Sequence, residues 1–377
     1  MGNKIRMGLC LALAFIFNSS IAADAPGSRA EVFGKAWFNP ARQTILIEQA
    51  LHKYYTVKEK GGWPKIKTPK KIYMKGQNDP AIRQLKARLH ASGDLASSDT
   101  SSIYTDELVA AVQQVQKRFG YEATGVVDKH LVSLLNVPVE DRIHQLEVNM
   151  ERFRNSKPIQ EGTRIVANIP EFRLYVYEGT TPVFDMAIVV GSSSTKTVIF
   201  DDEMTHVVLS PYWNVPPSIV RNEILPAMRR SSTYLKRNNY EQTGTENGLP
   251  VIRQKPGPGN SLGLVKFIFP NDHNIYLHDT PAKGLFQYPK RTFSHGCIRL
   301  EEPAKLANYL LRHDANWSEE KIRKAMNGGR EQWVKLETPV PVSLTYYTAW
   351  VDDEGLVHLR QDVYGHDKTY KMVAKTR

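Results

Sequence analysis

The stretch RTFSHGCIRL places a cysteine, Cys297, directly after a His-Gly pair. A thiolate attacks carbonyl carbon readily, but a free cysteine with a pKa of about 8.5 is only slightly ionised at neutral pH. A neighbouring base is therefore needed, and two histidines are candidates. His295 precedes the thiol by two residues, and His278 ends the apolar run NIYLH. Because one nearby imidazolium can lower a thiol pKa by about two units, we expect cysteine-dependent acyl transfer.

Two further residues of the same stretch suit this chemistry. Gly296 lacks a side chain, so the backbone can turn there and present amide N–H groups to a carbonyl oxygen as an oxyanion hole. Arg299 follows the thiol by two residues and can hold a carboxylate or form a structural ion pair. A zinc site made by His278, His295 and Cys297 is an alternative that lacks a fourth ligand, so we expect no metal and no cofactor.

The first residues have the layout of a secretory signal peptide. Basic residues precede an apolar run over residues 7–17, and small residues follow it. The run is too short for a membrane span, which needs about 20 residues. We expect cleavage after Ala22 and export, which leaves Cys297 as the single cysteine of the mature chain. An unpaired thiol in an exported protein is either a buried small side chain or a reactive group.

Charge and length narrow the function classes. The full chain has 50 basic and 39 acidic residues, and removal of Lys4 and Arg6 with the signal leaves 48 against 39, a net charge of +9. This excess suits an anionic polymer such as cell-wall material, or a membrane surface, although evenly solvated charge is an alternative. Export argues against nucleic acid as a partner. A chain of 377 residues is expected to form two or three domains.

Helical periodicity is typical of the first half of the chain. It predicts a helix over residues 42–54, and a small bundle of three helices that begin after Asp79, Thr105 and Asp128, all good N-caps. A further amphipathic helix is expected over residues 139–154. Near Arg164 the hydrophobic period changes from 3.6 to 2, which predicts a β-rich domain.

The second half contains a long polar segment and a helical end. Residues 219–263 are polar and glycine-punctuated, which is typical of a lid or of disorder. Beyond the thiol, Pro303 is expected to open one helix and Ser318 to cap another. The last segment, VPVSLTYYTAWVDDEGLVHLRQDVYG, is expected to form a closing hairpin that turns at residues 353–355. The fold class is therefore α+β and multidomain.

Several motifs of the chain resemble those of two known families. The run IYLHDTP, followed after a gap by FSHGCIRLEEP, resembles the YkuD catalytic domain of L,D-transpeptidases, and the 15 residues between His278 and Ser294 fit its spacing. The segments NIPEFRLYVYEG, PYWNVPPSI, RQKPGPGNSLGLVKFIFPN and YTAWVD are similar to the larger YcbB type of that family. Tyr104, Phe119 and GVVDKHLVSLLN resemble a peptidoglycan-binding domain, with a docking bundle that binds no wall as the alternative.

The resemblance implies a division of the chain and roles for the site residues. We expect a signal peptide (1–22), an N-terminal scaffold segment (23–75), a peptidoglycan-binding-like three-helix domain (76–137), a connecting helix (138–162), the catalytic domain (163–312, lid about 219–263), and a C-terminal helix and hairpin (313–377). The resemblance implies that Cys297 is the nucleophile, that His278 is the base, and that Asp279 orients the imidazole, commonly through its backbone carbonyl. It also implies that His295 and Gly296 contribute to the oxyanion site and that Ser294 and Arg299 support the motif. Tyr276 and Trp213 would either contact the substrate or pack in the core. Many family members have Asn at the position of Arg299.

The resemblance also implies a function and a location. We expect a monomeric periplasmic L,D-transpeptidase that forms 3-3 cross-links in peptidoglycan, with release of D-Ala from a tetrapeptide donor and with carbapenems as acylating inhibitors. Its partners would be the stem peptides and glycan, and other wall-synthesis proteins. Alternatives with the same cysteine are an L,D-carboxypeptidase, a D-amino-acid exchanger and a lipoprotein-attachment enzyme. A wall-binding protein without catalysis and a papain-like peptidase remain as further alternatives.

Overall fold

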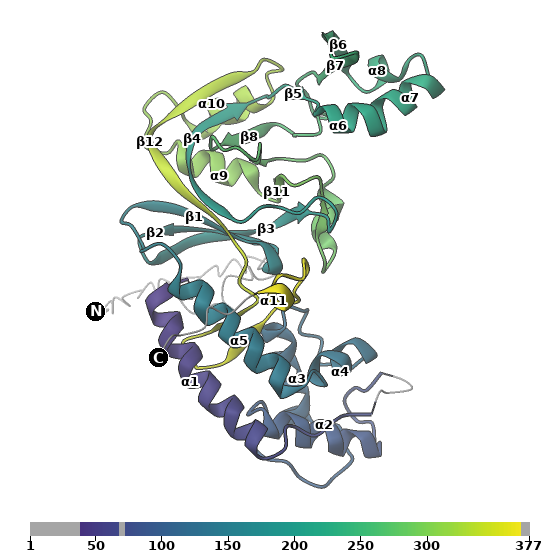
Figure 1. The fold of residues 1–377 in the computed structure, drawn as a ribbon, viewed down its shortest axis with the longest axis vertical. Helices are drawn as coiled ribbons and strands as arrows, with labels where there is room; N and C mark the ends of the chain where they lie inside the picture. The colour runs from purple at the N-terminus through teal and green to yellow at the C-terminus, as the bar shows by residue number, and fades with distance from the viewer. Residues whose placement is uncertain (1–37, 68–71, 371–377) are drawn as a thin grey trace, which may run out of the picture.

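The computed structural model describes residues 38–67 and 72–370 (Figure 1). The expected signal peptide and the first part of the scaffold segment lie outside the described residues. Within the described ranges, no helix combines the length and the apolar character that a membrane crossing requires. The α+β class predicted from the sequence is confirmed, because a helical N-terminal region precedes a β-rich domain.

A small helical domain is built from α2 (Pro80–Ala91), α3 (Asp106–Arg118) and α4 (Lys129–Leu135). Each helix begins where the sequence predicts, since the preceding Asp79, Thr105 or Asp128 side chain accepts a hydrogen bond from an N–H of the first turn. The apolar residues of the three helices form one core, which includes Ile82, Leu85, Leu89, Leu108, Val112, Val115, Leu131 and Leu135.

A second layer lies between this helical domain and the β-rich domain (Figure 1). It consists of α1 (Pro40–Glu59), α5 (Val139–Arg154) and the hairpin of β13 (Ala349–Val351) and β14 (Val357–Leu359). These elements share a core with the outer side of β1 and β2, and its members include Ile47, Leu146, Phe153, Tyr177 and Trp350. The hairpin turn falls at the predicted position.

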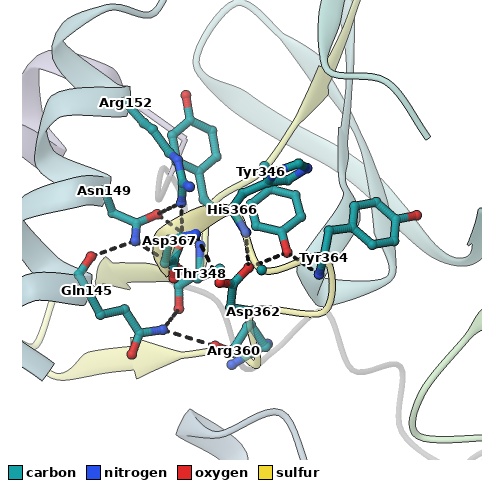
Figure 2. Close-up of polar contacts among 12 residues, drawn as sticks. Gln145, Asn149, Arg152, Tyr346, Thr348, Arg360, Asp362, Tyr364, His366 and Asp367 are labelled. Atoms are coloured by element: carbon teal, nitrogen blue, oxygen red, sulfur yellow. Dashed lines mark hydrogen bonds and ion pairs between the residues drawn. The ribbon is translucent and has the colours of Figure 1, made fainter. Parts of the chain in front are cut away.

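A buried polar network fastens α5 to the C-terminal segment (Figure 2). The Asn149 side-chain amide donates to Thr348 Oγ1 at 2.7 Å, and its oxygen accepts the Thr348 N–H at 2.9 Å. Thr348 in turn donates to Asp367 Oδ2 at 2.7 Å, and Arg152 pairs with Asp367 Oδ1 at 2.6 Å. Gln145 donates to the carbonyls of Thr348 and Arg360. Buried polar groups joined in this way position the helix against the C-terminal hairpin.

The β-rich domain is a barrel. Its nine-stranded sheet has the order β10-β3-β11-β9-β8-β4-β12-β1-β2, and the further pairing of β2 with β3 closes it. The strands are β1 (Thr163–Asn168), β2 (Arg173–Glu178), β3 (Thr181–Gly191), β4 (Phe200–Leu209), β8 (Val265–Ile268), β9 (Leu277–His278), β10 (Thr292–Ser294), β11 (Ile298–Leu300) and β12 (Gln332–Thr345). Inward side chains form an apolar core together with α9 (Pro303–Leu310) and α10 (Glu319–Met326).

The strand β12 changes the domain boundary expected at residue 312. It pairs with β4 on one side and with β1 on the other, so it is one of the strands of the barrel wall and not part of a separate C-terminal unit. The segment VPVSLT, expected as part of the closing hairpin, belongs to this strand. The expected boundary is therefore wrong, because a strand that completes a barrel cannot be separated from it.

The segment expected as a lid, residues 219–263, is folded. It belongs to a larger folded unit that starts at Trp213. The elements of this unit are β5 (Trp213–Asn214), α6 (Pro217–Ile219), η3 (Val220–Ile224), α7 (Leu225–Arg230), α8 (Tyr234–Arg237), β6 (Tyr240–Glu246) and β7 (Leu249–Gln254). The unit has its own three-stranded sheet and its own apolar cluster, whose buried members are Val215, Ile219, Val220, Ile224 and Ile252. Figure 1 shows it extending from the top of the barrel. We call residues 213–263 the capping unit.

Candidate active site

The nucleophile candidate lies in a tight loop between two barrel strands. Cys297 follows β10 and directly precedes β11, and its side chain is partly exposed. Ser294 Oγ braces the loop by donating to the Cys297 carbonyl at 2.5 Å, and Thr197 Oγ1 donates to the Gly296 carbonyl at 2.8 Å. Gly296 has φ of 120°, a conformation that favours glycine. A cysteine before a strand also differs from the helical cysteine of papain-like peptidases.

Strand register places the base candidate on the same face of the barrel as the thiol. In the parallel pair of β11 and β9, Arg299 lies opposite His278. Side chains alternate along a strand, so Cys297 and Arg299 face the same side, as do Tyr276 and His278. These side chains therefore gather on the outer face of the barrel, with the Tyr276 and His278 ring centroids 5.6 Å apart.

His278 is a buried, neutral imidazole. Its Nδ1 lies 2.5 Å from the Asp279 carbonyl oxygen. Burial, and next the charge of Arg299, lower the pKa of His278 to about 3, although hydrogen bonds to the Asp279 and Leu262 carbonyls oppose the shift. The ring is uncharged at neutral pH and can accept a proton at Nε2.

The Asp279 side chain does not contact the imidazole as its backbone carbonyl does, but binds the neighbouring backbone and Lys283. Its carboxylate accepts the N–H groups of Leu264 at 2.9 Å and Thr280 at 2.7 Å, and it pairs with Lys283 at 2.8 Å. Gly263, at φ of 63°, packs so closely that an added Cβ would overlap this carboxylate. Asp279 thus joins the base to the end of the capping unit.

The thiol is not held as a thiolate by an imidazolium, contrary to the sequence-based expectation. Burial raises the pKa of Cys297, and the hydrogen bonds from Tyr276 and the charges of Arg299 and Lys266 only reduce that shift. Its Sγ lies 3.6 Å from the Asn274 carbonyl, which accepts the S–H. The resting pair is therefore a neutral thiol and a neutral imidazole, since the burial of both groups penalises their charged forms.

The residues expected to form the oxyanion hole differ in whether they have a donor group that is open to a substrate oxygen. The Gly296 N–H is occupied, because it donates to Ser294 Oγ at 3.1 Å. The Cys297 N–H has no hydrogen-bond acceptor within the part of the chain that the structure describes, so it is the amide open to a substrate oxygen. His295 is exposed, and its Nε2 lies 3.0 Å from Glu223 of the capping unit. It therefore contacts the capping unit rather than the thiol.

The remaining predicted residues border the same face. Arg299 is partly exposed, its buried Nε has no hydrogen-bond partner, and no carboxylate of the described residues pairs with it. The alternative of a structural ion pair therefore finds no support among these residues. Trp213, from the capping unit, forms a side-chain hydrogen bond with Tyr276, and Tyr276 in turn forms one with Cys297.

Sequence reasoning missed some residues of this face. Lys266 lies opposite His278 in the pairing of β8 with β9, and Trp333 of β12 packs over its ammonium. A lysine inside the apolar run LVKFIFP is the signal that could have indicated a special position. The contact of Glu223 with His295 had no such signal, because it depends on the fold of the capping unit.

The described residues contain no cluster of three or more His, Cys, Asp or Glu side chains that could hold a metal ion. His278, His295 and Cys297 therefore do not make the ligand set of the zinc alternative.

A groove of about 640 Å³ lies between the helical domain and the barrel, with walls that include Tyr121, His130, Phe286, Tyr288 and Arg173.

Two family models match parts of this chain. Residues 162–342 match the family YkuD, described as "L,D-transpeptidase catalytic domain". Residues 78–135 match the family described as "Putative peptidoglycan binding domain".

A curated protein of Haemophilus influenzae named "Putative L,D-transpeptidase" is 30% identical over 240 residues, which are 59% of this chain and 48% of that protein. The chain thus spans about half the length of this relative. Among solved structures, an L,D-transpeptidase from Stackebrandtia nassauensis has 13% identity, a TM-score of 0.29, and coverage of 75% of this chain and 96% of that one. An L,D-transpeptidase from Mycobacterium smegmatis has 14% identity, a TM-score of 0.26, and coverage of 48% and 58%.

Proposed function

We propose that this protein is a periplasmic L,D-transpeptidase of the YcbB type that forms 3-3 cross-links in peptidoglycan. The observation that carries the proposal is the partly exposed thiol of Cys297 on the same barrel face as His278, whose Nδ1 is bound to the Asp279 carbonyl. The match of residues 162–342 to the catalytic domain and the signal-peptide pattern support it.

The neutral pair defines the first step. Cys297 Sγ attacks the carbonyl between the third residue and D-Ala of a donor stem while His278 Nε2 takes the thiol proton. The carbonyl oxygen becomes an oxyanion within reach of the Cys297 N–H. As the tetrahedral intermediate collapses, the C–N bond breaks and His278 returns the proton to the leaving amine. The products are free D-Ala and a thioester.

The second step reverses the roles. An amine of another stem attacks the thioester carbon, His278 Nε2 accepts the amine proton, and the proton returns to the sulfur when the C–S bond breaks. The capping unit beside His295 favours amine over water by limiting solvent at the thioester. The helical domain, proposed over residues 76–137, would hold the glycan near the barrel, and the domain match over residues 78–135 supports peptidoglycan as the partner.

Purified tetrapeptide muropeptides test the proposal. Incubation with the protein should release D-Ala and give cross-linked dimers, detected by liquid chromatography and mass spectrometry. The Cys297→Ala variant should release none. A carbapenem should add its mass to the wild type and not to Cys297→Ala. Release of D-Ala without dimers would instead indicate the carboxypeptidase, and turnover by Cys297→Ala would refute the nucleophile.

A further inference from the structure

Three neighbouring strands place three chemical groups in a line across the barrel face. Lys266 of β8 lies opposite His278 of β9, and His278 lies opposite Arg299 of β11, which shares its face with Cys297. Neighbouring strands are about 4.8 Å apart. From strand to strand, Lys266, His278 and Arg299 therefore lie in one row, and the Cys297 thiol lies two residues before Arg299 on the same face.

The Lys266 ammonium is held in place without a counter-ion. Its Nζ lies 5.7 Å from the centroid of the Tyr276 ring and 5.3 Å from that of Trp333. Among the described residues, no carboxylate lies within ion-pair distance of it. The acid that attracts it most, Glu331, uses one oxygen to accept the Tyr212 N–H at 2.8 Å and the other to accept the Trp333 indole N–H at 3.1 Å.

A partly buried cation without an anionic partner is unfavourable, and a ligand carboxylate would relieve this cost. Lys266 is half-buried, and burial lowers its pKa. The two aromatic rings fix the ammonium over the sheet through cation–π contacts. Its position beside the base points to an anion that arrives with the reacting amine.

The chemistry of the proposed reaction supplies such an anion in both steps. In D-Ala, the leaving amine and the carboxylate are attached to the same carbon. In the acceptor diaminopimelate, the attacking amine also shares its carbon with a carboxylate. Because Lys266 lies directly opposite His278, a carboxylate on the carbon that carries the reacting nitrogen lies near the ammonium when that nitrogen is at the base.

We propose that Lys266, held between Tyr276 and Trp333, forms a carboxylate-binding subsite for the amino acid whose amine is at His278. The subsite holds the leaving D-Ala during acylation and the α-amino carboxylate of the acceptor during transfer. The Lys266 ammonium gives and takes no proton in either step. This inference rests on the proposed function and makes Lys266 a determinant of leaving-group and acceptor choice.

Binding without turnover gives the first test. In the Cys297→Ala background, calorimetry compares a tetrapeptide stem with the same peptide carrying a neutral C-terminal amide. The free acid should bind roughly 10-fold to 100-fold more tightly, as expected for a charge-assisted contact. Adding Lys266→Met should bring the ratio close to one, and Lys266→Arg should keep part of it. Lys324→Met, which removes an exposed lysine from α10, should leave the ratio unchanged.

Kinetics separates carboxylate binding from a general effect of charge on the thiol. Lys266→Met should reduce kcat/KM for D-Ala release by a similar factor and leave release of D-alaninamide nearly unchanged. Alkylation of Cys297 by iodoacetamide measures the separate effect of the Lys266 charge on the thiol pKa, and its loss of rate should be smaller than the loss in D-Ala release. Equal losses for both donors, or an unchanged acid-to-amide binding ratio, would overturn the subsite. If the wild type prefers the acid in binding but releases no D-Ala, the subsite stands and the proposed function fails.

Discussion

The Nδ1 atom of His278 lies 2.5 Å from the backbone carbonyl oxygen of Asp279. A carbonyl only accepts hydrogen bonds, so Nδ1 carries the proton and Nε2 of the neutral ring keeps its lone pair. With a His278 pKa lowered to about 3 and a Cys297 pKa raised, both groups are neutral over the physiological range.

This charge state predicts the pH dependence of thiol reactivity. Iodoacetamide reacts with the thiolate, and the thiolate fraction of Cys297 should rise about tenfold per pH unit from pH 6 to about 9. The alkylation rate, followed by intact mass, should rise in parallel. Since protonation of His278 is confined to strongly acidic pH, no plateau is expected near pH 5 to 8. A plateau in that range would indicate a thiolate–imidazolium pair and contradict the neutral pair.

The contact between His295 and Glu223 should influence substrate binding. The two side chains are 3.0 Å apart but exposed, and exposed pairs contribute little energy. Glu223→Gln should therefore raise the KM for a tetrapeptide by about twofold to fivefold through looser placement of the capping unit, with kcat nearly constant. Steady-state kinetics measures this effect. Glu246→Gln, an exposed change on strand β6, is the matched control, and an equal effect of both variants would exclude a role for the contact.

The tight packing of Gly263 against Asp279 should make this glycine sensitive to substitution. A Cβ at residue 263 would overlap the Asp279 carboxylate, and its φ of 63° is unfavourable for other residues. Gly263→Ala should displace Asp279 and the base, and lower kcat/KM by about 10-fold or more. Gly284→Ala, where an added Cβ meets nothing within 4 Å, should have normal activity. Normal kinetics of Gly263→Ala would argue against the coupling of Asp279 to the base.

Much of this arrangement could be predicted from the sequence. Caps and apolar spacing identify α2, α3 and α4, because helix signals are local. The motif around Cys297 and its distance from His278 identify two residues that the structure has on one barrel face. In contrast, the position of Lys266 depends on the register of β8 with β9, which no local pattern encodes.

The features that the sequence did not predict have separate physical origins. The boundary at residue 312 was wrong because β12 pairs with β4 and β1, both far away in the sequence. The capping unit had the composition of a loop, since its few buried apolar residues, such as Ile224 and Ile252, are separated by polar ones. The thiol pKa was expected to fall because sequence alone gives the neighbours of a group but not its burial.

The buried network of Figure 2 should matter for stability rather than for chemistry. Asn149 is fully buried and exchanges hydrogen bonds with Thr348 in both directions. Asn149→Ala should lower the free energy of unfolding by about 2 to 4 kcal/mol, since partners lose their hydrogen bonds inside the protein. Chemical denaturation measures the change. Gln114→Ala on the exposed side of α3 should change it by less than about 0.5 kcal/mol, and equal effects would contradict the role of the network.

The place of β12 between β4 and β1 also constrains how the chain is made. Ribosomes synthesise the strands in order, and until residue 345 has emerged, β4 and β1 both present unpaired backbone edges. The reactive loop at Cys297 is therefore translated well before the barrel that orients it can close. Acyl transfer therefore depends on a strand that ends at residue 345, so a chain cut short before β12 would carry the reactive loop without the closed barrel that orients it.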